Sequence, residues 1–309
     1  MGLFSRLAEL WKSKDEKNYD AEVKKDIGTP KLLEADPIYQ DPIFSNPRPA
    51  VFSHGNEEEQ TKHLLQKLLD KYKGTTLEQI FPQGLLHVID GESCFHIQSE
   101  NQGLFARPCG ELCRDYVMSN LKLIRGIGPH YEMKLKTEGY NTLSDLIEHS
   151  RYGSSAQEIV SLFDEDPCDM VDCVSGLVQS ASDPSVLALS GLIDEKDLLF
   201  MDIETLGLAG VPLILIGVGE MSEGIITVNQ YLLRDIKEEY AALQSYLIHL
   251  RSKKALFTYN GKSFDVPFID GRFAYNGIPE AHDITHFDLM HFCRRRWKDS
   301  LPDCKLKTI

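Results

Sequence analysis

Residues 198–205 read LLFMDIET, an apolar run that contains two acidic side chains. The run is typical of a buried strand, and Asp202 and Glu204 stand two positions apart in it. Side chains at positions i and i+2 of a strand project from one face, so both carboxylates are expected to point into one space. Two neighbouring like charges favour a cation between them, and carboxylate oxygens suit Mg²⁺ or Mn²⁺. A strand-end cap beside a solvated carboxylate is the simpler alternative.

The segments that follow predict a mixed α/β sheet flanked by helices. LILIGVGE (213–220) and IITVNQYLL (225–233) are two further apolar strands, separated by glycine-bearing turns. An amphipathic helix leads to a fourth strand, ALFTYN (255–260). A second helix at 264–275 and a fifth strand, THFDLMHF (285–292), complete the pattern.

A third acidic side chain follows the fourth strand. The chain turns through Asn260 and Lys262, which places Asp265 near the start of the next helix. If the fourth strand runs parallel beside the first, the Asp265 carboxylate can face Asp202 and Glu204. Asn260 is expected to anchor the turn by hydrogen bonding. The alternative role for Asp265 is that of an N-terminal helix cap.

The motifs MDIET (201–205) and YNGKSFDVPF (259–268) resemble the first two motifs of the DnaQ-like, DEDD superfamily of 3′–5′ exonucleases. The closer resemblance is to YprB-like ribonuclease H-like proteins, and it covers residues 196–309. It implies a ribonuclease H-like fold and two-metal hydrolysis of phosphodiester bonds. It also implies roles for five residues: Asp202, Glu204 and Asp265 as catalytic ligands of two Mg²⁺ or Mn²⁺ ions, and Thr205 and Leu206 beside the terminal nucleotide.

A fourth carboxylate of that superfamily belongs to an HxxxD or YxxxD pattern in a late helix. No His or Tyr stands four places before any of the later aspartates, which are Asp270, Asp283, Asp288, Asp299 and Asp303. We expect Asp288 to be a structural group of the fifth strand. The missing carboxylate is expected beyond Ile309, in a chain that is truncated at its C-terminus and carries an incomplete site.

Residues 121–150 predict a compact helical unit upstream of the sheet. A short helix is expected to end at Gly126, and Gly128 followed by proline is expected to open a second one. The pattern around Arg125, Gly126 and Gly128 resembles a helix-hairpin-helix, in which backbone amides bind phosphate without reading sequence. A plain helical turn is the alternative. Three lysines could add positive charge here: Lys122, Lys134 and Lys136.

A basic run, RRRWK, occupies residues 294–298. Cations interleaved with an aromatic ring suit the binding of single-stranded nucleic acid. We therefore count Arg294 and Arg295 as candidate nucleic-acid contacts, together with Asn260 and Lys262. A solvated basic surface after the fifth strand is the alternative.

The overall charge does not by itself favour a nucleic-acid partner. The chain of 309 residues carries a net charge of −14, but residues 197–309 hold 13 Lys and Arg against 15 Asp and Glu. Binding needs a local basic surface rather than a basic total. No apolar stretch reaches the roughly 18 residues of a membrane span. Seven cysteines without a CxxC pair indicate reduced thiols and a cytoplasmic location.

The chain is expected to contain five segments. The first is rich in charge and proline, which is typical of a flexible leader. In order, they are a leader at 1–60, a small α+β segment at 61–120, the helix-hairpin-helix-like unit at 121–150, a helical connector at 151–196 and the exonuclease domain at 197–309. Together they predict a protein that acts on DNA or RNA with a single strand or a free 3′ end. Two other functions stay open, a nucleic-acid-binding or scaffold protein without turnover and a structure-selective endonuclease or resolvase.

Overall fold

A computed structural model describes residues 63, 66–67, 69–102, 110–164, 166–178, 180, 182–207, 210–279, 282–306 and 308. The expected leader at 1–60 lies outside the described residues. The chain divides into two compact units, one of residues 15–82 and one of residues 1–14 with 83–309. The described part of the first unit includes the short helix α3 (Leu77–Ile80), which is capped by the side chain of Thr76. The sheet and the other labelled helices belong to the second unit.

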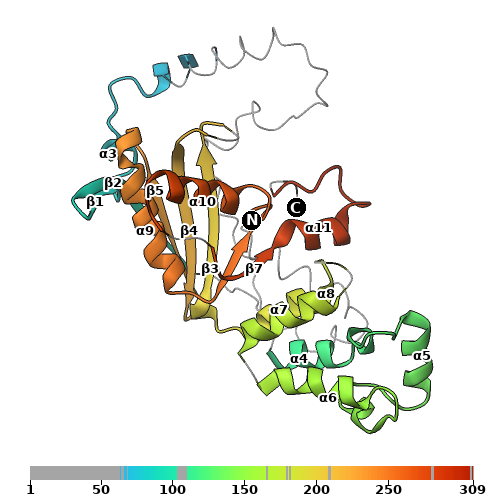
Figure 1. The fold of residues 1–309 in the computed structure, drawn as a ribbon. Helices are drawn as coiled ribbons and strands as arrows, with labels where there is room; N and C mark the ends of the chain where they lie inside the picture. Colours follow the sequence, from blue (N-terminus) through green and yellow to red (C-terminus); the bar gives the residue numbers. More distant parts are fainter. Residues whose placement is uncertain are drawn as a thin grey trace. The chain divides into compact units, whose positions relative to one another are not determined.

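One seven-stranded sheet organises the larger unit (Figure 1). Its strands are β1 (Leu85–Ile89), β2 (Glu92–Gln102), β3 (Leu198–Thr205), β4 (Leu213–Ser222), β5 (Ile225–Leu232), β6 (Ala255–Thr258) and β7 (Thr285–Asp288). They lie in the order β1-β2-β5-β4-β3-β6-β7. β3 pairs antiparallel with β4 and parallel with β6, and β6 pairs parallel with β7. The mixed sheet predicted from the sequence is therefore confirmed.

Helices connect and cover these strands. The α-helices of this unit are α4 (Gly110–Met118), α5 (Pro129–Thr137), α6 (Gly153–Ser161), α7 (Pro167–Leu177), α8 (Pro184–Leu189), α9 (Glu239–Arg251), α10 (Asp265–Tyr275) and α11 (Leu289–Trp297). Short 3₁₀ helices include η3 (Leu121–Leu123) and η4 (Asp145–Glu148). Aspartate caps followed by proline begin both α7 and α8, a combination that favours helix starts. None of the described helices is long and apolar enough to cross a membrane.

The predicted fifth strand, 285–292, was too long. The strand ends at Asp288, and Leu289 begins α11. The carboxylate of Asp288 accepts the backbone amide of Met290 at 3.1 Å, which is the bond of a helix N-cap. The basic run at 294–298 consequently lies mostly on a helix.

The hairpin of β1 and β2 extends the same sheet. Its turn is made by Asp90 and Gly91, both with positive φ, a conformation that suits a two-residue hairpin. β2 then pairs antiparallel with β5 from Phe95 to Gln102. Part of the predicted 61–120 segment thus joins the sheet built by residues 197–309, while the predicted boundary at residue 120 stays a prediction.

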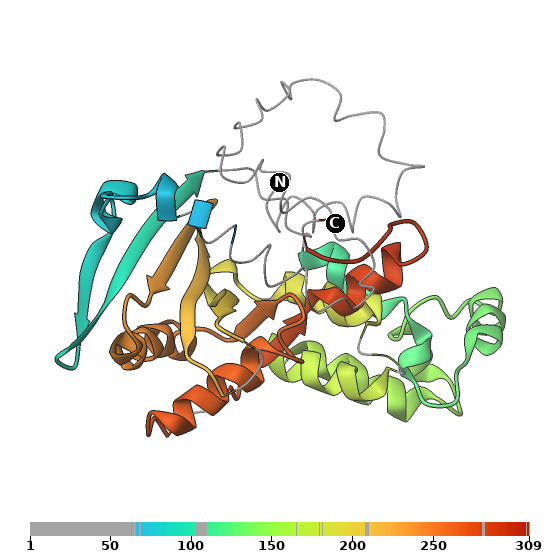
Figure 2. The same ribbon diagram turned by 90° about the horizontal axis from the view of Figure 1, so that it is seen from above.

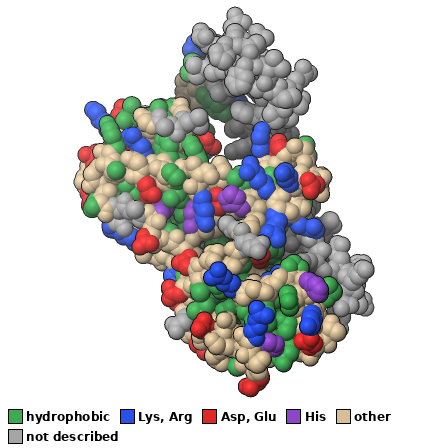
Figure 3. Space-filling view, turned by 45° about the vertical axis from the view of Figure 1, so that its right-hand side comes forward, with side chains coloured by type: hydrophobic (Ala, Val, Ile, Leu, Met, Phe, Trp, Pro, Cys, Tyr) green, Lys and Arg blue, Asp and Glu red, His purple; other side chains and the backbone are tan. Residues whose placement is uncertain are grey.

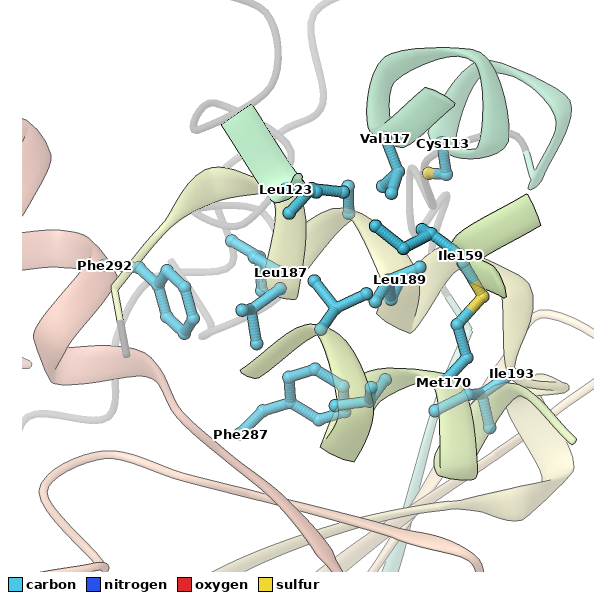
Figure 4. Close-up of a cluster of buried hydrophobic side chains, with 14 of the residues drawn as sticks. Cys113, Val117, Leu123, Ile159, Met170, Leu187, Leu189, Ile193, Phe287 and Phe292 are labelled. Atoms are coloured by element: carbon cyan, nitrogen blue, oxygen red, sulfur yellow. The ribbon is translucent and has the colours of Figure 1, made fainter. Parts of the chain in front are cut away.

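Each face of the sheet is covered by its own apolar core. Leu199, Met201 and Ile203 of β3 pack with residues of α9 and α10, which run along one side of the strands (Figures 1 and 2). Leu198 and Phe200 point the opposite way and pack with α4 to α8 and with α11. Figure 4 shows this second core, where Phe287 of β7 and Phe292 of α11 face the side chains of the helices. The face of Leu198 and Phe200 is called the acidic face below, because it also carries Asp202 and Glu204.

Candidate functional site

The acidic pair lies where the helical cover of the acidic face ends. Along β3, Leu198 and Phe200 are buried beneath the helices, whereas Asp202 and Glu204 on the same face are exposed. Strand alternation explains why all four side chains share this face. The sequence therefore places two accessible carboxylates directly beyond a closed apolar core.

A glycine leaves space beside Asp202. Asp202 is paired across β3 and β4 with Gly217, and Phe200 with Gly219. Among the described residues, a Cβ atom built on Gly217 would meet only the backbone oxygen of Asp202, at 3.6 Å, and no side chain within 4 Å. This open position was not predicted from the sequence. Glycines two positions apart in the predicted strand 213–220 were the available signal, since they must share one face.

Asp265 is attached to β3 by a hydrogen bond. It is the first residue of α10, is 5% exposed and accepts the amide hydrogen of Ile203 at 3.3 Å. The pairing of β3 with β6 runs only to Phe200 opposite Phe257, so β6 does not reach Ile203. The Asp265 carboxylate takes the place of a strand neighbour at this point.

The three carboxylates influence one another electrostatically. Burial, together with the negative charge of Asp202, raises the pKa of Asp265 to about 6. Although Asp202 is exposed at the surface, neighbouring atoms displace part of its water shell, and this desolvation raises the pKa of its carboxyl, with a second contribution from the charge of Glu204. Neighbouring acids with raised pKa values, here Asp202 and Asp265, are a common feature of functional sites.

The donor chemistry of this group fits a hard divalent cation, but a closed ligand cage is not formed. Among the residues that the structure describes, no three His, Cys, Asp or Glu side chains are arranged to hold a metal ion. The repulsion of Asp202 by Glu204 and of Asp265 by Asp202 is what a divalent cation would relieve. A metal role for these three residues stays a prediction.

The residues after the first motif lie at the end of β3. The hydroxyl of Thr205 donates to the carbonyl of Gly207 at 2.7 Å, so it is engaged locally. Leu206 is 66% exposed next to the acidic pair. An exposed leucine at this position is consistent with the predicted contact to a nucleotide.

The turn between β6 and α10 is anchored as predicted, but by its backbone. The amide of Asn260 donates to the buried carboxylate of Asp288 at 2.8 Å, and the amide of Lys262 donates to the same carboxylate at 3.1 Å. The expected structural role of Asp288 is thus confirmed, although it ends the strand rather than lying within it. The side chain of Lys262 is exposed.

The basic run forms a cationic surface on α11. Arg294, Arg295 and Arg296 are exposed on the helix and Lys298 directly follows it, and none of the four has an ion-pair partner in the described part of the chain. Because Phe292 packs in the core beneath the acidic face, α11 lies on the same side of the sheet as Asp202. Figure 3 shows Lys and Arg side chains gathered on the surface in this region.

The glycine turn of residues 125–128 leads into α5 at the predicted position, but the short helix before it, η3, ends at Leu123 rather than at Gly126. Gly126 has a φ of +93°, and Gly128 is the N-cap of α5. Arg125 is exposed. The lysines expected to add charge are instead ion-paired within the unit: Lys122 and Lys136 with Glu132, at 3.1 and 3.3 Å, and Lys134 with Glu138, at 3.7 Å. The net positive charge of this surface is therefore smaller than the sequence suggested.

Comparison with known proteins agrees with this architecture. Residues 199–309 match the family described as the RNase_H superfamily, and the mixed sheet flanked by helices is a ribonuclease H-like α/β fold. The chain is also similar to the "Uncharacterized protein YprB" of Bacillus subtilis (strain 168), with 36% identity over 121 residues. That match covers 38% of this chain and 29% of the relative's length. The matched residues include all but the first residue of β3, together with β6 and α10, and therefore the three carboxylates Asp202, Glu204 and Asp265.

Proposed function

We propose that the protein is a metal-dependent 3′–5′ exonuclease that hydrolyses phosphodiester bonds of DNA or RNA. The observation that carries the proposal is the hydrogen bond of Asp265 to the amide of Ile203, which attaches Asp265 to the strand that carries the exposed pair Asp202 and Glu204. These three side chains would hold Mg²⁺ or Mn²⁺. When bound, two such ions supply an activated hydroxide and stabilise the charge of the leaving oxygen.

The surroundings of the acidic pair support a nucleic-acid substrate. The arginines of α11 lie on the same side of the sheet, are exposed and have no ion-pair partner among the residues that the structure describes, so they would meet phosphates. The open space at Gly217 gives access to Asp202, and the exposed Leu206 would contact the terminal nucleotide. The turn at Arg125, Gly126 and Gly128 would hold the backbone further upstream, as a helix-hairpin-helix does.

Release of mononucleotides from a single-stranded oligonucleotide labelled at its 5′ end tests the proposal. With Mg²⁺ or Mn²⁺, the protein should shorten the strand stepwise from the 3′ end, and EDTA should stop the reaction. Asp202→Asn should lower the rate at least a hundredfold. Glu100→Gln is the matched control, because Glu100 is an exposed carboxylate on β2 that projects from the opposite face.

A binding protein without turnover is the second candidate, and the lack of a closed metal cage among the described residues favours it. In that case the oligonucleotide binds but stays intact with either metal. Internal cleavage products of fixed length would instead indicate a structure-selective endonuclease.

A further inference from the structure

A buried carboxylate outside the acidic group makes three hydrogen bonds to backbone amides. Asp288, at the end of β7, is 2% exposed. Its Oδ1 accepts the amides of Asn260 at 2.8 Å and Met290 at 3.1 Å, and its Oδ2 accepts the amide of Lys262 at 3.1 Å. The Met290 bond caps α11. The other two bonds reach across to the turn between β6 and α10.

That turn has little freedom to relax. Asn260 has a φ of +71°, an uncommon conformation for a residue other than glycine. Gly261 packs so tightly that a Cβ atom there would lie 2.3 Å from Oγ1 of Thr258. Its amide also donates to the same Oγ1 at 3.2 Å. Such a conformation persists only where its surroundings fix it, and Asp288 supplies two of the bonds that do so.

The turn determines where α10 begins. The amide of Ser263 donates to the carbonyl of Asn260 at 3.1 Å, and the amide of Val266 donates to the carbonyl of Gly261 at 3.0 Å. Asp265 lies between these two bonds as the first helical residue. Asp288 therefore holds the turn at Asn260 and Lys262, and the two bonds within the turn fix the backbone on either side of Asp265.

We propose that Asp288 is a positioning residue, which holds Asp265 against β3 by fixing the turn at residues 260–262. It acts on the position of Asp265 through that turn, because its hydrogen bonds go to the amides of Asn260, Lys262 and Met290; its charge acts on Asp265 separately, by adding to the effect of burial that raises the pKa of that carboxyl. Its effect on hydrolysis rests on the proposed nuclease function, whereas its effect on the position of Asp265 does not.

Two substitutions remove the hydrogen bonds of Asp288 to different extents. Asp288→Ala removes the acceptors of all three amides. In Asp288→Asn the side-chain oxygen can stay at the Oδ1 position and still accept the amides of Asn260 and Met290. The NH₂ group then faces the amide of Lys262, and this bond is lost because both groups are donors. Asp288→Asn should therefore fold and show the smaller effect.

Hydrogen exchange at the amide of Ile203, followed by NMR in EDTA, reports the position of Asp265 directly. Ile203 lies in β3 and its amide is held by Asp265 rather than by Asp288. Relative to the other amides of β3, its exchange should accelerate at least tenfold in Asp288→Ala and severalfold in Asp288→Asn. Asp265→Ala removes the acceptor of the Ile203 amide altogether, so the exchange rate in this variant is the reference for complete loss of the bond.

Asp183→Ala is the matched control. Asp183 also caps a helix, α8, by accepting the amide of Ser185 at 2.9 Å, and it lies far in sequence from the turn at residues 260–262. This variant should lose stability without a selective change at Ile203. If Ile203 accelerates no more in Asp288→Ala than in Asp183→Ala, Asp288 is only a helix cap and the proposal is wrong.

Turnover adds a separate measurement. If the wild type releases nucleotides, Asp288→Asn should lower kcat at least tenfold more than Asp183→Ala does. If the wild type is inactive, the proposed nuclease function fails, and the exchange of Ile203 still decides whether Asp288 positions Asp265.

Discussion

Glu239 at the start of α9 and Arg272 in α10 form a buried ion pair, with Nε of Arg272 2.8 Å from Oε1 of Glu239. Burial alone would raise the pKa of Glu239, but hydrogen bonds from Arg272, the Leu213 amide and Asn276 hold it below its usual value. The pair ties together the two helices that cover one face of the sheet. It also fixes the helix whose first residue is Asp265.

Removal of one partner should be costly. Arg272→Met leaves the Glu239 carboxylate buried without its cation, and we expect the free energy of unfolding to fall by about 3–5 kcal/mol. Urea denaturation measures this loss. Adding Glu239→Gln to that variant should recover part of it, because the remaining side chain is neutral. Lys134→Met, at a largely exposed ion pair, should cost less than about 1 kcal/mol; equal losses in the lysine and arginine variants would contradict the prediction.

Asp265 should destabilise the metal-free protein at neutral pH. Its folded pKa of about 6 lies above the value of about 3.9 in an unfolded chain. The folded state therefore binds the extra proton between roughly pH 4 and 6, and stability from this group is lost as the pH rises through that window. The full shift corresponds to about 3 kcal/mol, which relaxation of the site reduces to about 1–2 kcal/mol.

Asp265→Asn tests this reasoning, because the amide oxygen can still accept the Ile203 amide without carrying charge. In EDTA at pH 7.5 the variant should be more stable than the wild type, and the difference should shrink below pH 4. Urea denaturation at pH 4, 5.5 and 7.5 gives the comparison. A variant that is less stable than the wild type at pH 7.5 would show that the charge of Asp265 is already compensated in the fold. Mn²⁺ should stabilise the wild type only, if the proposed site binds it.

Features that depend on residues close together in the sequence could be predicted, whereas features that depend on contacts between distant residues could not. The strand 198–205 was located without error, because its apolar run and its acidic positions are local signals. The exposed pair Asp202 and Glu204 followed from the same alternation. The placement of Asp265 next to β3 was also foreseen, since a parallel strand beside β3 brings the start of the next helix to that edge.

Other features depend on interactions that no local pattern encodes. β2 pairs with β5, whose residues lie more than a hundred positions later, and no pattern in the sequence indicates that partner. The ion pair of Glu132 with Lys122 likewise depends on how η3 packs beside α5. The ion pair of Glu132 with Lys136 is different, because the two residues stand four positions apart in α5 and their spacing could have been recognised in the sequence. The start of α11 was missed for a different reason: the apolar residues after Asp288 hid an aspartate helix cap that could have been recognised.

The arginines of α11 should contribute to nucleic-acid binding through charge. Arg294→Gln combined with Arg295→Gln should weaken binding of a single-stranded oligonucleotide and reduce the slope of log Kd against log salt by about 1 for each phosphate that is no longer neutralised. Fluorescence anisotropy in EDTA over a range of salt concentrations measures both. Lys237→Gln is the control, since Lys237 is exposed in the short helix just before α9, on a different part of the sheet unit. An unchanged slope in the double variant would mean that α11 is only a solvated surface.

Gly128 offers the sharpest test of the glycine turn before α5. A Cβ atom added there would meet no atom of the described residues within 4 Å, and its φ of −93° is open to any residue. Gly128→Ala should therefore fold with a melting temperature within a few degrees of the wild type. If a phosphate approaches the amides of this turn closely, the added methyl group should lower nucleic-acid affinity about tenfold, or about 1.4 kcal/mol. Gly176→Ala adds a methyl group at another open position, in α7, and should leave affinity unchanged. Equal affinities of both variants and the wild type would identify residues 125–128 as a structural turn, because a backbone phosphate site cannot accept a side chain at no cost.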